Sequence, residues 1–128
     1  MTRVLLISLA GALGTASRYF VGVFAGRALG TAFPYATLIV NVLGCFLIAL
    51  VSELALSTTL VSPTLRMTLT TGFMGGFTTY SSFNYETTTL LVRDRAWATG
   101  LTNVGVTMLG CFVAGLLGLA VARRIAGS

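Results

Sequence analysis

Residues 71–86 (TGFMGGFTTYSSFNYE) hold most of the side chains in this chain that could act on an ion. They combine a Gly-Gly pair, a run of hydroxyls, five aromatic rings and the carboxylate of Glu86. Glycines and clustered hydroxyls weaken a helix, and lipid cannot satisfy the backbone groups that are then freed. Such backbone persists in a membrane only where protein buries it or where it lines a water-filled path. The stretch therefore predicts a path or a site for an ion.

Asn41 lies in a second stretch of interest, the apolar run LIVNVL at residues 38–43. A carboxamide in hydrocarbon needs a partner, because leaving it unpaired costs several kcal/mol. One interpretation is a hydrogen bond between helices, worth about 0.6–2 kcal/mol. The other is an NH2 donor that faces an anion path. The sequence leaves both open, and Thr37, one turn earlier, shares the same helix face.

Four aromatic residues, Phe73, Phe77, Tyr80 and Phe83, recur at intervals of four, three and three. Packing is the ordinary explanation of such a stripe, but the glycines interrupt this one. An aromatic ring has a positive edge, so edges that line a narrow pore can hold an anion without a full positive charge. Weak binding of this kind lets the ion leave, as conduction requires.

The expected break in this helix also frees carbonyl oxygens around Gly75 and Thr78. Convergent carbonyls form a site for a bare alkali cation. Alternatively, serine and threonine hydroxyls and water satisfy these groups.

Arg18 and Glu86 are charged residues inside apolar segments. Arg18 either extends to the membrane interface or raises the local anion concentration. Glu86 needs a partner or a wet cavity, and the two residues are candidates to neutralise each other.

Composition indicates what positions these side chains. The chain has 128 residues, 55% hydrophobic and only 9% charged, whereas soluble domains carry about 25% charged residues. A membrane-crossing helix takes roughly 20 residues, so the chain is predicted to be one all-α transmembrane domain, residues 1–128. This leaves no room for a catalytic or nucleotide-binding domain, and no enzyme activity is expected.

Four spans are expected, at residues 3–24, 35–56, 64–92 and 97–122, the third broken near the middle of the membrane. The first span also resembles a signal peptide. We favour a helix there, because cleavage would leave three spans.

Eight arginines against three acidic residues give a net charge of +5. They are scattered at helix ends, which indicates anchoring in a lipid bilayer rather than nucleic-acid binding. Four arginines lie on the side of the termini and three or four on the other, so the chain is predicted to insert in both orientations and to pair as an antiparallel homodimer. The alternative is that one or two arginines fix a single orientation. With no histidine, a zinc-type site is not expected, and Cys45 and Cys111 are interpreted as small buried hydrophobes.

Three stretches resemble the Fluc (CrcB) fluoride channels: residues 11–19 (GALGTASRY), Thr37 with NVLG at 41–44, and the highly specific GFMGGFTTYSSF at 72–83. The resemblance covers most of the chain. It implies an antiparallel, dual-topology homodimer of four-helix subunits with two pores. Such proteins export fluoride passively from the microbial cytoplasm, so the resemblance implies that the chain lies in the bacterial inner membrane.

The resemblance also implies roles for particular residues. Asn41 would donate to fluoride, Tyr80 and Phe83 would present ring edges to the pore, and Ser81 and Ser82 would line the pathway. The family usually has Phe at the position of Tyr80 and often Thr at that of Ser82. The added Tyr80 hydroxyl could donate to an anion, bind water or obstruct a narrow path.

Two further sites follow from the same resemblance. Carbonyls of Gly75 and Thr78 from both subunits would hold a structural Na+ at the dimer centre. The polar entrance would comprise Arg18, Thr37 and Glu86.

Two other functions compete with a fluoride channel. A small multidrug-type cation exporter needs a membrane carboxylate that is accessible from both sides. The first span has none, and Glu86 lies away from the centre of its span. A purely structural membrane subunit would explain the glycines but neither the break nor Asn41.

Overall fold

The computed structural model describes residues 1–127, and every regular element in that range is helical. Three helices are continuous: α1 (Thr2–Leu29), α2 (Tyr35–Ser57) and α6 (Trp97–Ala126). Each is long and apolar enough to cross a membrane. Between α2 and α6 the chain forms a segmented rod: α3 (Pro63–Met67), the π-helix η1 (Thr68–Met74), α4 (Gly75–Phe77), α5 (Tyr80–Thr88) and the π-helix η2 (Thr89–Arg93). The predicted arrangement of four helices with an interrupted third one is therefore present.

The first and last helices extend beyond their predicted ends, to Leu29 rather than residue 24 and to Ala126 rather than residue 122. Arginines occupy the last turn of each, Arg27 in α1 and Arg123 with Arg124 in α6. Positive side chains stabilise the negative end of a helix dipole. The apolar pattern alone therefore placed these two ends too early.

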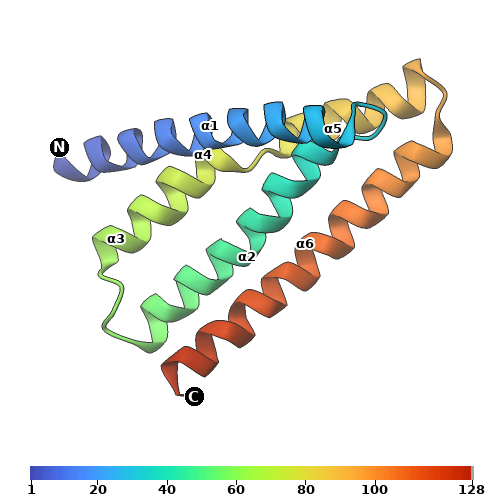
Figure 1. The fold of residues 1–128 in the computed structure, drawn as a ribbon. Coiled ribbons are helices and arrows are strands. Elements are labelled where there is room, and N and C mark those ends of the chain that lie inside the picture. The colour runs from blue at the N-terminus through green and yellow to red at the C-terminus, as the bar shows by residue number, and fades with distance from the viewer. Residues whose placement is uncertain (128) are drawn as a thin grey trace.

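The four helical rods run back and forth, so that both termini and the α2–α3 connection lie towards one end of the molecule (Figure 1). The α1–α2 connection and the turn before α6 lie towards the other end. Helix α2 packs along α6, and α1 packs along η1 and α4. Glycines allow these contacts: a Cβ on Gly14 would overlap the Phe73 carbonyl, and one on Gly118 would overlap the Phe46 carbonyl.

The interruption lies at Thr78 and Thr79, not at the Gly-Gly pair where the sequence placed it. Gly75 is helical, with φ −60° and ψ −36°, whereas Thr78 and Thr79 are extended. Gly76 serves packing, because a Cβ there would overlap the Gly11 carbonyl of α1. The glycine pair thus lets the third rod approach α1, and the threonines end its first half.

Much of the apolar surface remains open on the single subunit. Leu13 on α1 is 65% exposed and Phe112 on α6 is 67% exposed. Side chains of this size on the outside of a helical bundle suit contact with lipid or with another subunit.

Candidate ion site at the interrupted helix

Asn41 holds the interruption by pairing with the peptide groups of Thr79. Its Nδ2 donates to the Thr79 carbonyl at 3.0 Å, and its Oδ1 accepts from the Thr79 amide at 2.8 Å. Both residues are buried. This two-bond pairing satisfies backbone groups that an unbroken helix would satisfy internally.

The two interpretations of Asn41 are therefore compatible. One N–H of its NH2 group connects α2 to the interrupted rod, as the interhelical interpretation requires. An amide nitrogen carries two N–H donors, and the bond to Thr79 uses one of them.

Thr79 also starts the second half of the rod. Its hydroxyl accepts from the Ser82 amide at 3.2 Å and donates to the Ser82 hydroxyl at 3.0 Å. The Ser81 hydroxyl lies 3.2 Å away. A threonine at this position is a favourable N-cap. Ser81 and Ser82 thus contact the cap of α5, and their place on an ion pathway stays a prediction.

A cavity of about 340 Å³, here called the inner cavity, lies between α2, the interruption and α6. Five residues that the sequence analysis proposed for an ion path or cation site line it: Asn41, Gly75, Thr78, Tyr80 and Phe83. No residue of its lining is charged. Segments far apart in the sequence therefore converge on one uncharged space with amide, hydroxyl and aromatic groups in its wall.

The aromatic stripe divides into two pairs at the interruption. Phe73 and Phe77 stack, with ring centroids 5.7 Å apart and planes 19° apart. Tyr80 and Phe83 lie 5.7 Å apart with planes tilted by 53°. Phe83 is buried, but Tyr80 is 73% exposed on the single subunit. Only the second pair lines the inner cavity.

The carbonyls of Gly75 and Thr78 depart from the regular helix pattern. The Thr79 amide donates to Asn41 rather than to the Gly75 carbonyl. The Thr78 carbonyl accepts from Nη1 of Arg18 at 3.4 Å. Carbonyl oxygens suit a hard cation such as Na+, and the contact with Arg18 shows that the Thr78 oxygen already faces positive charge.

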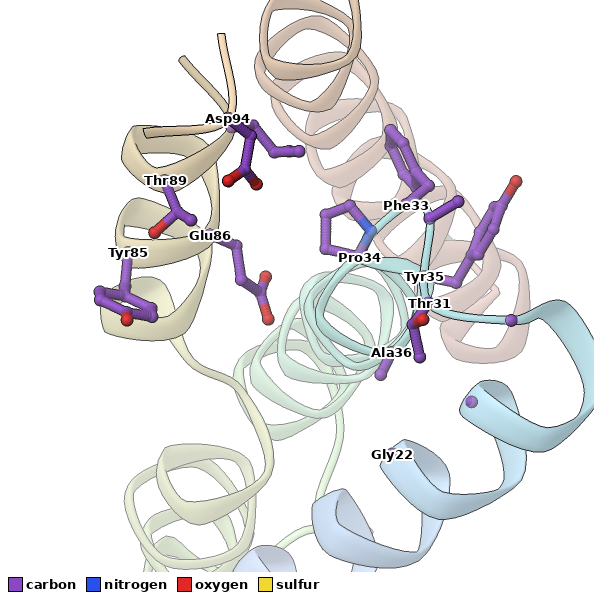
Figure 2. Close-up of a pocket in the computed structure, with 14 residues that line it drawn as sticks. Gly22, Thr31, Phe33, Pro34, Tyr35, Ala36, Tyr85, Glu86, Thr89 and Asp94 are labelled. Carbon is purple, nitrogen blue, oxygen red and sulfur yellow. The ribbon is translucent and has the colours of Figure 1, made fainter. Parts of the chain in front are cut away.

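Glu86 belongs to a separate space of about 320 Å³, here called the outer cavity, which is also lined by Tyr85, Thr89 and Asp94. Figure 2 shows Glu86 extending from its helix towards the start of α2. Its Oε1 accepts from the Thr37 hydroxyl at 2.8 Å, whereas its Oε2 is buried without a partner.

The structure does not bring Arg18 and Glu86 together, so the suggestion that they neutralise each other was wrong. Arg18 contacts Thr78 instead. Among the described residues, an ion pair joins Arg123 to Glu53 at 3.2 Å, between α6 and α2. Thr37 and Glu86 do meet, as two of the three residues predicted for the polar entrance.

The sequence interpretation missed Asn103, which is 1% exposed. Its Nδ2 donates to the Thr87 hydroxyl at 2.9 Å, and its Oδ1 accepts from Thr107 at 3.4 Å. Asn103 could have been found by the same sequence feature that identified Asn41, a carboxamide inside an apolar helix. Asn103 joins α6 to α5 and does not line the inner cavity, although Thr107 does.

Comparison with known proteins gives a consistent result over almost the whole chain. The family described as CrcB-like protein, Camphor Resistance (CrcB), matches residues 5–119. A protein from Sorangium cellulosum is 50% identical over 125 residues, which cover 98% of this chain and 98% of that protein. Proteins from Citrifermentans bemidjiense and Anaeromyxobacter sp. (strain K) are 42% and 46% identical over at least 98% of this chain and 100% of their own length. All three are named Fluoride-specific ion channel FluC.

Proposed function

This chain belongs to the CrcB family, and we propose that it is a passive, fluoride-selective channel that exports fluoride from the cytoplasm. It is a multi-pass membrane protein. Its relatives bear the name of an ion channel and not of an enzyme, which agrees with the expectation from composition. Nothing in these similarities supports the alternative of a multidrug-type cation exporter.

The lining of the inner cavity is the observation that best supports this function. It offers an anion the second N–H of Asn41 and the aromatic rings of Tyr80 and Phe83, with no charged residue in its lining. Donors and ring edges attract an anion through partial charges. The ion is therefore held weakly enough to move on, which conduction requires.

We further propose that two subunits insert in opposite orientations and form an antiparallel homodimer with two pores. Tyr80 and Gly75 line the inner cavity yet are exposed on the single subunit. A partner that covers this face would close the cavity and exclude lipid from it. The near-equal arginine content of the two sides of the membrane supports insertion in both orientations.

The dimer proposal predicts different effects at two glycines that have open space around them. A Cβ at Gly75 or at Gly105 would meet no atom within 4 Å in the subunit. Gly75→Val is expected to convert the dimer to monomer and to stop fluoride conduction, because the added side chain meets the partner. Gly105→Val, on α6, is the matched control and keeps the dimer. Light scattering of the purified variants in detergent measures this, and dimers of equal stability for both would refute the proposed interface.

We also propose that Gly75 and Thr78 carbonyls from both subunits hold a structural Na+ at the dimer centre. The Gly75 carbonyl lacks the Thr79 amide as its helical partner, and carbonyl oxygens suit a hard cation. Arg18, which donates to the Thr78 carbonyl at 3.4 Å, would release that oxygen when Na+ binds. When bound, Na+ would supply a fixed positive charge between the subunits. Thr37 and Glu86, which meet in the structure, remain the proposed polar entrance, whereas Arg18 contacts Thr78 instead. Ser81 and Ser82 remain proposed residues of the pathway.

Export can be tested in cells. In a bacterial strain that lacks its own fluoride exporter, expression of this chain is expected to lower cytoplasmic fluoride and to restore growth in fluoride-containing medium. Asn41→Asp, checked for equal expression in the membrane, serves as the inactive control. Unchanged cytoplasmic fluoride with the wild-type chain in the membrane would contradict the proposed function.

A further inference from the structure

Two cysteines lie near each other where α2 packs against α6. Cys45 on α2 and Cys111 on α6 are both free and half-buried. Both residues line the same two cavities, and the thiols lie close enough to influence each other electrostatically. One turn further along α6, a Cβ on Gly115 would lie 4.0 Å from the Cys45 carbonyl. Close approach of the two helix backbones therefore holds the thiols together.

The thiol pair is part of the wall of two spaces. Both cysteines line the inner cavity beside Asn41 and Phe83. Both also line a separate apolar groove with Phe112 and Leu116. A ligand bound between the two sulfurs would consequently lie at the edge of the space through which fluoride is proposed to pass.

We propose that Cys45 and Cys111 form a two-coordinate site for a thiophilic divalent ion such as Hg2+, whose binding obstructs the inner cavity. Thiolate sulfurs are soft ligands and select soft metals. Each thiol gives up its proton and forms one S–Hg bond, while the hydroxide or acetate ligands of the ion leave, the hydroxides as water, so no electron is transferred. The two thiolates neutralise the divalent ion, and a neutral product is suited to a site within the membrane.

The ligand set distinguishes this ion from other metals. Structural zinc takes four ligands, and the part of the chain that the structure describes has no group of three or more His, Cys, Asp or Glu residues arranged to hold a metal. A monovalent ion between two thiolates would leave a net negative charge in an apolar wall. A divalent ion that accepts linear coordination avoids both problems.

Metal binding can be measured without any transport. Mercuric acetate is titrated into the purified protein in thiol-free, chloride-free buffer. The ultraviolet thiolate–metal absorption is recorded, and the thiols that remain reactive are counted with a thiol reagent. One ion per subunit is expected, with both thiols lost at one equivalent. Cys45→Ser and Cys111→Ser should each lose the absorption of the two-sulfur site. Two ions per subunit, or an unchanged absorption in either variant, would overturn the shared site.

The effect on the cavity is measured as fluoride efflux from liposomes with and without Hg2+, and this arm rests on the proposed function. One equivalent of Hg2+ should lower wild-type efflux roughly tenfold or more, since a filled constriction blocks conduction, and excess small thiol should restore it. The ratio of treated to untreated efflux should stay near one in both serine variants. Full efflux with the metal bound would overturn the obstruction. Failure of the untreated protein to conduct would refute the channel function instead, while the titration would still decide whether the site exists.

Discussion

The inner and outer cavities are similar in size, about 340 and 320 Å³, but they differ in charge. The inner cavity is lined by Asn41, Tyr80 and Phe83 without any charged side chain. The outer cavity has the carboxylates of Glu86 and Asp94 in its wall. One space therefore offers partial positive charges to an anion, and the other offers negative charge.

The difference separates two tasks within the same subunit. Short-range contacts in the inner cavity should decide whether a fluoride ion is accepted. Charge at the outer cavity acts over longer range and is screened by salt. Changes in the inner cavity are therefore expected to lower conduction at any ionic strength, and changes at the outer cavity to alter its rate mainly at low salt.

The largest effect is expected from Asn41→Asp. The aspartate keeps an acceptor for the Thr79 amide but loses both N–H donors and places an acceptor opposite the Thr79 carbonyl. Losing a hydrogen bond to a charged group costs about 1.5–3 kcal/mol, so fluoride efflux should fall roughly tenfold or more.

Asn103→Asp is the matched control, because Asn103 is also buried and hydrogen-bonded but lies outside the lining of the inner cavity. Thermal unfolding in detergent compares the stability costs of the two changes. If both reduce efflux equally at equal stability, the loss reflects damage to the helical bundle and not the donor in the cavity.

A smaller effect is expected from Phe83→Leu. Leucine keeps an apolar side chain but removes the ring edge, and aromatic contacts contribute about 0.5–1.5 kcal/mol. Fluoride efflux from liposomes should fall by roughly two- to tenfold. Tyr85→Leu removes a ring from the wall of the outer cavity and should change efflux little. Equal losses in the two variants would remove the distinction between the cavities.

The smallest effect is expected from Asp94→Asn. Asp94 is exposed in the turn before α6 and lines the outer cavity. Removing its negative charge should raise fluoride efflux by about twofold at low ionic strength, through easier approach of the anion. The gain should disappear near 1 M of an inert salt, where the screening length is about 3 Å. A gain that persists in high salt would place Asp94 in direct contact with the ion path.

Most of the architecture follows from the sequence, because apolar length and composition specify helices in a membrane. The position of the interruption could not be predicted from the sequence, because local propensity favours a break at Gly75 and Gly76. Tertiary packing decides otherwise: Gly76 lies against α1, whereas Asn41, 38 residues earlier in the chain, satisfies the peptide of Thr79. Hydrogen bonds between residues so far apart in the chain leave no pattern in the sequence near the interruption.

Five of the predicted site residues share one cavity, whereas their roles stay predictions and some of their contacts were not foreseen. Asn41, Gly75, Thr78, Tyr80 and Phe83 converge because the interruption faces α2. The predicted pairing of Arg18 with Glu86 was wrong. A guanidinium can donate to a backbone carbonyl as well as to a carboxylate, and a sequence does not show which of the two it meets. The meeting of Cys45 and Cys111 depends on the rotation of α2 against α6, which apolar residues on all sides of both helices leave undetermined.

The most direct test is efflux of fluoride and of chloride, measured in parallel from liposomes that contain the purified protein. Rapid fluoride release with negligible chloride release is predicted, and it would show that the Tyr80 hydroxyl leaves the path open. Equal release of both anions would contradict selectivity by the inner cavity. If neither ion moves, efflux through the Tyr80→Phe variant is measured next. Recovery of fluoride release would identify the hydroxyl as an obstruction. No fluoride release from this variant either would contradict the channel function.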